Sequence, residues 1–169
     1  MPRPGPADYS LFSAHYVMSV KENDLLVALK KQQKPLLAFL NSIPEAKADY
    51  AYAEGKWTVK QLLQHMIDTE RIFAFRALWI ARNSKAPLIS FDENIFAAAA
   101  DVQNRTIASL VEEMLTVRKT TEFLFNSFTG EDMTKKGKLN DHFVTVNALG
   151  YILVGHVTHH LQVYQERYA

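Results

Sequence analysis

The sequence contains no cysteine among its 169 residues. This absence excludes disulfides, thiolate nucleophiles and cysteine-ligated metal sites, so any metal ion must bind nitrogen or oxygen atoms. The GxSxG, P-loop and GxGxxG motifs are also missing. The sequence therefore lacks the signatures of the α/β-hydrolase nucleophile and of phosphate- and dinucleotide-binding loops.

The chain also lacks an excess of charge of either sign. Nineteen basic residues face eighteen acidic ones, for a formal net charge of +1, which gives no electrostatic case for nucleic acid or an anionic membrane as a partner. The N-terminal stretch "MPRPGPADYS" has no apolar core of a signal peptide, and no apolar run reaches the ~18 residues of a membrane span. We therefore expect a cytoplasmic location and a small-molecule substrate of unknown identity.

Four long segments carry apolar residues at helical spacing, without the alternation typical of strands. They cover about 22–41, 58–83, 104–128 and 145–168. One apolar stripe on each segment predicts an all-α four-helix bundle in a single domain of residues 1–169. Residues 1–10 carry three prolines and a glycine, which predicts an extended arm rather than a packed element.

Local signals mark the ends of these helices. Thr58 and Gln61 form a capping box at the start of the second helix, and Thr145 is the expected N-cap of the fourth. Pro35 is expected to kink or split the first helix, and Gly130 to cap the C-terminus of the third. The polar, basic stretch 129–144 reads as a loop. The stripe of the third helix is predicted to contain Ile107, Leu110, Met114, Val117, Phe123 and Leu124.

The stretch "GHVTHHLQVY" at 155–164 holds three of the six histidines. A helix turns about 100° per residue, so His156 and His160 lie about 40° apart, near the centre of the apolar stripe. His159 borders the stripe, towards Gly155 and the polar side. The same construction places His65 on the inward face of the second helix. Three inward imidazoles from two helices could therefore meet in the core.

Two interpretations of these histidines stay open at this point. Each could be a hydrogen-bonded core residue, because a single histidine on an apolar face most often is. Alternatively, one divalent cation would satisfy all three imidazoles together, and histidine nitrogens suit zinc, nickel, iron or copper more than magnesium or calcium. Val157 follows His156, so there is no HExxH motif, and the absence of Glu-x-x-His argues against a ferritin-like dinuclear centre.

Three blocks of the chain resemble the DinB/YfiT-like superfamily of metalloenzymes. These are "KWTVKQLLQHMIDTERIFAFRALWIAR" at 56–82, "FDEN" at 91–94, and the histidine-containing segment at 147–168. The resemblance implies a four-helix bundle and one divalent metal ion per chain, often nickel or zinc. Matched residue by residue, the implied ligands are His65, His156 and His160, and the remaining coordination positions would hold water or substrate.

Three protein ligands with open positions are typical of a catalytic rather than a structural metal site. The first hypothesis is a hydrolase in which the metal activates water. Relatives of this type include thiol-dependent S-transferases, so a metal-dependent thiol S-transferase is the alternative. A non-catalytic metal- or ligand-binding bundle, joined as a homodimer through an apolar helix face, is the third.

Three further side chains are candidates for the pocket. Asp68 either orients a ligand imidazole or is a solvated helix residue. Arg76 either binds an anionic substrate group or pairs with an acidic residue of a neighbouring helix, and we favour the pairing. His159 would replace His160 if the last helix were rotated.

For the other polar and aromatic candidates we expect simpler roles. Asp92 and Glu93 are expected to cap a short helix. The aromatic residues Trp57, Phe73 and Trp79 of the first block are expected in the core rather than at a ligand. No partner is expected for the remaining two histidines, His15 and His142.

Overall fold

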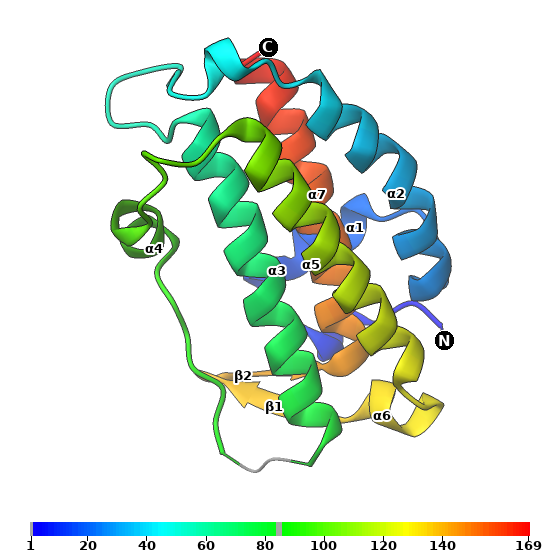
Figure 1. Ribbon diagram of the computed structural model, residues 1–169. Coiled ribbons are helices and arrows are strands. Elements are labelled where there is room, and N and C mark those ends of the chain that lie inside the picture. Colours follow the sequence, from blue (N-terminus) through cyan, green and yellow to red (C-terminus); the bar gives the residue numbers. More distant parts are fainter. Residues whose placement is uncertain (1, 84–85) are drawn as a thin grey trace.

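The computed structural model describes residues 2–83 and 86–169, and four long helices form its body (Figure 1). These are α2 (Leu25–Ser42), α3 (Val59–Ala81), α5 (Ile107–Ser127) and α7 (Val146–Arg167). The predicted four-helix bundle is therefore confirmed. Within the described residues, no helix combines the length and the apolarity needed to cross a membrane.

The order of the helices in the bundle differs from a simple up-and-down arrangement. Both α2 and α3 pack against α5 and α7, so α2 and α3 occupy opposite corners. Figure 1 shows α3 and α5 running in one direction and α2 and α7 in the other. Residues 86–106, which include the short helix α4 (Glu93–Ala99), return along α3 to the start of α5.

The two predicted N-caps, Thr58 and Thr145, agree with the structure. The capping box at Thr58 and Gln61 is present, and the Thr145 side chain accepts a hydrogen bond from the Ala148 N–H. Pro35 does not split α2, which continues through it. The predicted C-cap at Gly130 is wrong, because α5 ends at Ser127 and Gly130 begins another short helix.

From its polar composition we expected the stretch 129–144 to be a loop, and this expectation is wrong. The stretch contains α6 (Gly130–Thr134) and an antiparallel hairpin of β1 (Lys136–Leu139) and β2 (His142–Thr145). Asn140, in the tight turn, adopts a φ of 52°. The hairpin packs on the end of α3, where an added Cβ at Gly137 would lie 2.5 Å from an Ile80 side-chain carbon. The contact with α3 stabilises the hairpin, and the composition of the stretch alone does not reveal this contact.

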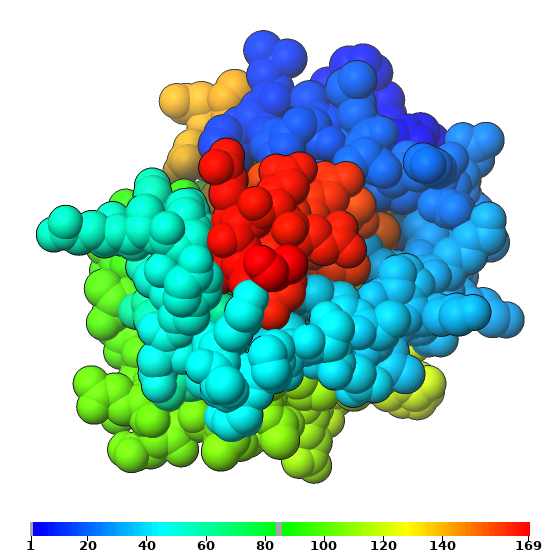
Figure 2. All heavy atoms as spheres, turned by 90° about the horizontal axis from the view of Figure 1, so that it is seen from above, coloured from blue at the N-terminus to red at the C-terminus, as the bar shows by residue number. Residues whose placement is uncertain are grey.

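Helix α7 is the central element of the fold, and its first three turns are buried on every side. The expectation of one apolar stripe with a polar back is therefore wrong for this helix. The additional cover comes from α1 (Ala14–Ser19), which packs against α7. In Figure 2 the red end of α7 lies between the blue N-terminal region and the cyan segment that links α2 to α3. Gly155, predicted on the polar side, is buried beneath α1.

The N-terminal segment is packed rather than extended as an arm, although Met1 lies outside the described residues. Arg3 donates hydrogen bonds to the carbonyls of Val17 and Val20 at the end of α1. Two short 3-10 helices, Pro6–Asp8 and Leu11–Ser13, lead into α1. A third, Glu45–Lys47, lies in the link between α2 and α3.

A buried polar network connects all four long helices. Arg118 on α5 donates to both carboxylate oxygens of Glu70 on α3, at 2.7 and 2.8 Å, and to Oε1 of Gln32 on α2 at 2.7 Å. The Gln32 amide nitrogen donates to the Val154 carbonyl of α7 at 2.7 Å. The stripe of α5 accordingly includes Arg118, whereas Phe123, predicted to face the core, is 66% exposed.

Replacement of Arg118 by methionine should destabilise the fold strongly. The Glu70 side chain is only 1% exposed, so the variant would leave a buried carboxylate without its cation, at a cost of about 3–5 kcal/mol. Arg71→Met, which breaks an exposed pair with Glu113 on the same helices, should cost about 1 kcal/mol or less. Urea unfolding of both variants tests this, and equal losses would contradict it.

Replacement of Gly155 by alanine should displace α1. An added Cβ would lie 2.0 Å from the Tyr16 carbonyl oxygen, a backbone atom that can yield only if α1 moves. We expect a loss of about 1–3 kcal/mol in the free energy of unfolding, despite the better helix propensity of alanine. Gly130→Ala is the matched control, since a Cβ there meets nothing within 4 Å. Equal stability of the two variants would show that α1 packs differently.

Candidate metal centre

The three histidines selected by helical spacing meet in the core between α3 and α7. His65 lies in the second turn of α3, and His156 and His160 lie one turn apart on α7. All three side chains are buried. The His65 Nε2 atom lies 2.9 Å from Nε2 of His156 and 3.1 Å from Nε2 of His160, and the latter two atoms are 3.0 Å apart.

Hydrogen bonds between the imidazoles cannot account for this triangle. Each neutral ring presents Nε2 either as a donor or as an acceptor. Among three such Nε2 atoms, at most two of the three pairs can join a donor to an acceptor. At least one pair must therefore consist of two donors or two acceptors. A cation at the centre would instead accept a lone pair from all three nitrogens. The donor set and its geometry therefore fit a metal ion.

The surroundings of the triad favour the neutral, ligand-competent form of each ring. Burial lowers the pKa of His65 to about 4 and that of His160 to about 2. Burial, reinforced by the nearby His160 and His65, also holds the pKa of His156 well below its usual value. Metal binding requires neutral imidazole, so near pH 7 no proton has to be displaced first.

A cavity of about 610 Å³ opens beside the three histidines. Its lining combines large apolar side chains with polar ones, among them the histidines, Arg76 and several serines. A small molecule with both apolar and polar groups could bind there. Its walls come from α3, α7, the segment before α4, the N-terminal region and the hairpin. The triad is thus buried on its helix side and accessible to a small molecule from the cavity side.

Asp68 does not orient a ligand imidazole. Its carboxylate accepts a hydrogen bond from Gln64 at 2.9 Å and lies 4.0 Å from Arg71, on the side of α3 that faces α5. The residue that reaches a ligand is Thr69, whose Oγ1 lies 3.5 Å from Nδ1 of His65. Its position four residues after His65, on the same helix face, was the available signal for it.

Arg76 is not paired with an acidic residue, contrary to the interpretation we favoured. Its Nη2 donates to the Ile89 carbonyl, and its Nε atom has no hydrogen-bond partner among the described residues. No acidic side chain of residues 2–83 and 86–169 forms an ion pair with it. Arg76 lines the same cavity as the triad, and burial lowers its pKa.

His159 does not replace His160 in the triad. It is half-buried, lines the cavity, and lies with its ring 5.7 Å from that of Tyr16 and 6.0 Å from that of His15. Burial is the main cause that lowers the pKa of His159. His142, on the hairpin, also lines the cavity, so neither His15 nor His142 is as isolated as the sequence indicated.

Two of the three aromatic residues expected in the core lie at the site. The Trp57 ring is 4.6 Å from the His65 ring, and the Phe73 ring is 6.4 Å from that of His156. All three rings pack against the hydrophobic core as expected, and Trp57 and Phe73 also line the cavity, whereas Trp79 donates to the Ala86 carbonyl. Asp92 caps α4 as expected, by accepting from the N–H groups of Asn94 and Ile95.

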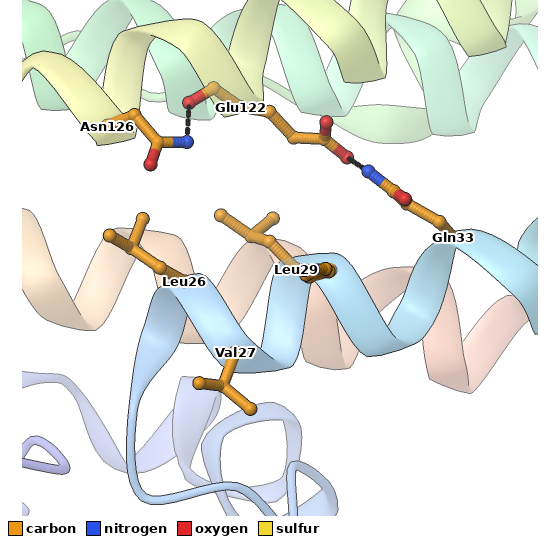
Figure 3. Close-up of a pocket in the computed structure, with 7 residues that line it drawn as sticks. Leu26, Val27, Leu29, Gln33, Glu122 and Asn126 are labelled. Carbon is orange, nitrogen blue, oxygen red and sulfur yellow. Dashed lines mark hydrogen bonds between the residues drawn. The ribbon is translucent and has the colours of Figure 1, made fainter.

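A second cavity, of about 350 Å³, lies between α2 and α5 (Figure 3). Its one carboxylate belongs to Glu122, which accepts a hydrogen bond from the Gln33 amide at 2.7 Å. The Asn126 amide donates to the Glu122 backbone carbonyl, and the other wall is formed by side chains such as Leu26 and Leu29. These polar groups already have partners, so the cavity beside the histidines is the better candidate site.

Comparison with known proteins identifies the family of this chain. The family model of the DinB superfamily matches residues 28–163. The chain belongs to this superfamily. The resemblance inferred from the three sequence blocks is thereby confirmed. A search of curated proteins found no match.

One solved structure similar to this DinB-superfamily chain is that of YfiT from Bacillus subtilis. That protein is described as a probable metal-dependent hydrolase with an unusual four-helix bundle topology. The two structures align with a TM-score of 0.69 over 96% of this chain and 89% of that one, at 16% sequence identity. At this identity the likeness shows the shared fold.

The buried triad should make the metal-free protein sensitive to acid. The pKa of His65 falls from 6.5 in the unfolded chain to about 4 in the folded one, so below pH 6.5 the unfolded chain binds more protons. The free energy of unfolding should therefore decrease as the pH falls from 6.5 towards 4. Each histidine of this kind contributes a slope of about 1.4 kcal/mol per pH unit.

Urea unfolding in the presence of a chelator, at a series of pH values, measures this slope. In His65→Gln the slope should be smaller than in the unmodified chain. Carboxylates that titrate in the same range are common to both proteins, so the difference isolates the histidine. Identical pH profiles would contradict the assignment of His65 as a buried neutral imidazole.

Proposed function

We propose that this chain is a metal-dependent hydrolase whose divalent ion is bound by His65, His156 and His160. The observation that carries the proposal is the triangle of three buried Nε2 atoms, 2.9 to 3.1 Å apart, at the wall of a cavity. Membership of the DinB superfamily and the likeness to YfiT, itself described as a probable metal-dependent hydrolase, support it.

The spacing of the nitrogens fits a single ion. Three atoms 2.9 to 3.1 Å apart can all lie about 2 Å from one point beside them, which is the usual distance between zinc and a histidine nitrogen. Histidine nitrogens suit nickel and zinc alike, so the proposal includes both ions.

When bound, a divalent ion of this type lowers the pKa of coordinated water to about 7 and polarises a substrate carbonyl. The chain's own residues set the conditions for that chemistry. Burial keeps the imidazoles neutral, while Trp57 and Phe73 shield the rings of His65 and His156. Thr69 restrains the His65 ring from its Nδ1 side. The cavity then limits access to a small molecule that enters from the open side.

Metal binding can be measured directly on protein purified without a histidine tag. We expect one nickel or zinc ion per chain by elemental analysis, and loss of stoichiometric binding in His65→Ala. His142→Ala is the matched control, because His142 lines the same cavity but lies outside the triad. Equal metal content in the two variants would refute the ligand assignment.

The two tryptophans allow a second readout of the same event. In Trp79→Phe the remaining Trp57 ring lies 4.6 Å from the His65 ring. Nickel, an open-shell ion, should quench its fluorescence with the stoichiometry found by elemental analysis. Absence of quenching with one ion bound per chain would place that ion away from His65.

The reaction type is decided by turnover of the metal-loaded chain. An ester and amide panel tests the hydrolase, and a panel of low-molecular-weight thiols with electrophiles tests the alternative, a metal-dependent thiol S-transferase. Turnover that is present in His142→Ala and lost in His65→Ala supports metal-dependent catalysis. Tight metal binding without turnover on either panel would favour a non-catalytic binding bundle.

A further inference from the structure

One face of α3 extends from the histidine triad to a buried cation at the other end of the cavity. His65, Thr69, Phe73 and Arg76 all line this cavity. Eleven residues make about three helical turns, so His65 and Arg76 point in nearly the same direction, with their Cα atoms about 16 Å apart along the axis. The cavity therefore has two chemically different ends on a single rigid helix.

The guanidinium group of Arg76 is the unusual feature of the second end. The residue is only 4% exposed, and its Nε atom is buried without a hydrogen-bond partner among the described residues. The rings of Phe73 and Phe91 lie 5.5 and 5.6 Å from its central carbon. A guanidinium remains charged in proteins, and a buried charge is unfavourable unless an opposite charge compensates it.

The acidic groups near this end of the cavity do not supply that charge. Asp92 is engaged at the N-terminus of α4. Glu93 lines the cavity, but it forms no ion pair with Arg76, and its charge contributes instead to the raised pKa of Tyr16. Across the described part of the chain, the Arg76 side chain therefore has one carbonyl partner and no anionic one.

Large apolar side chains also line the cavity. They include Phe73, Phe91, Leu149, Ile152 and the exposed side chains of Leu11 and Phe143. These side chains favour a ligand with an apolar body.

We propose that Arg76 binds a carboxylate or phosphate group of an elongated, otherwise apolar substrate whose other end reaches the three histidines. The bidentate geometry of a guanidinium suits both anions, and the free Nε–H offers one of the two parallel donors. The second half of this proposal rests on the proposed metal-dependent function. Anion binding at Arg76 does not depend on that function, so the experiment can contradict either part of the proposal without the other.

The experiment measures binding of phenylbutyrate, phenylbutyramide and inorganic phosphate to the full chain, with nickel and with chelator. NMR of the Arg76 Nε–H reports on the site itself. We expect phenylbutyrate to shift this signal whether or not metal is present, and the neutral amide to leave it unchanged. Comparison with phosphate identifies the preferred anion.

Variants separate anion binding from a structural role. Arg76→Gln should weaken phenylbutyrate binding about tenfold or more and leave phenylbutyramide binding unchanged, because only the charged contact is lost. Arg82→Gln, an exposed arginine at the end of the same helix, should change neither. If near-ultraviolet circular dichroism shows that Arg76→Gln is unfolded, Arg76→Lys replaces it. The NMR signal of the Arg76 Nε–H in the unmodified chain then tests whether Arg76 binds the anion.

Three results would overturn the proposal. Equal loss of acid and amide binding in the folded Arg76→Gln chain would mean that Arg76 only holds the Ile89 segment in place. A shift of the Arg76 Nε–H in Glu93→Gln without ligand would identify Glu93 as its partner in solution. Carboxylate binding that requires nickel and survives in Arg76→Gln would place the anion at the metal, while leaving the proposed function intact.

Discussion

The arrangement of the bundle depends on one buried ion pair and the hydrogen bonds attached to it. Arg118 joins Glu70 to Gln32, and Gln32 in turn holds the Val154 carbonyl, so α5, α3, α2 and α7 are linked at one level. Buried charges are tolerated only when their partners are in place. Sliding one helix against another would break this network, so it restrains the register of all four.

The position of this network explains how the histidines come to meet. Glu70 follows His65 by five residues on α3, and Val154 precedes His156 by two on α7. The restraint therefore acts within about one and a half turns of each contributing helix to the triad. Three Nε2 atoms within 3.1 Å of one another leave little tolerance for a shift of α3 along α7.

Part of this arrangement could be derived from the sequence because it depends on local rules. The capping box at Thr58 requires only two residues three positions apart, and the common direction of His156 and His160 requires only the pitch of a helix. That His65 meets His156 and His160 was inferred only from the inward direction of all three side chains. The resemblance to the superfamily then identified the same three residues as the ligands of one metal ion.

The errors share a physical origin, because each depends on a neighbour that is distant in sequence. Asp68 lies beside Arg71, which forms an ion pair with Glu113 of α5, and the angle of Asp68 relative to His65 does not reveal this. Phe123 is exposed because the inward stripe of α5 passes through Arg118 instead. Gly155 was placed on the polar side of its helix because α1, which covers it, was not predicted.

The polar groups of the core fall into two sets, and the contrast between them bears on function. In the four-helix network, the charged groups of Glu70 and Arg118 are matched by partners, as expected of a structural element. At the cavity, Nε of Arg76 is buried without a partner among the described residues, and the Nε2 atoms of the three histidines point at one another. Such groups lower stability unless a ligand satisfies them, so their presence along one cavity is better explained by ligand binding than by folding.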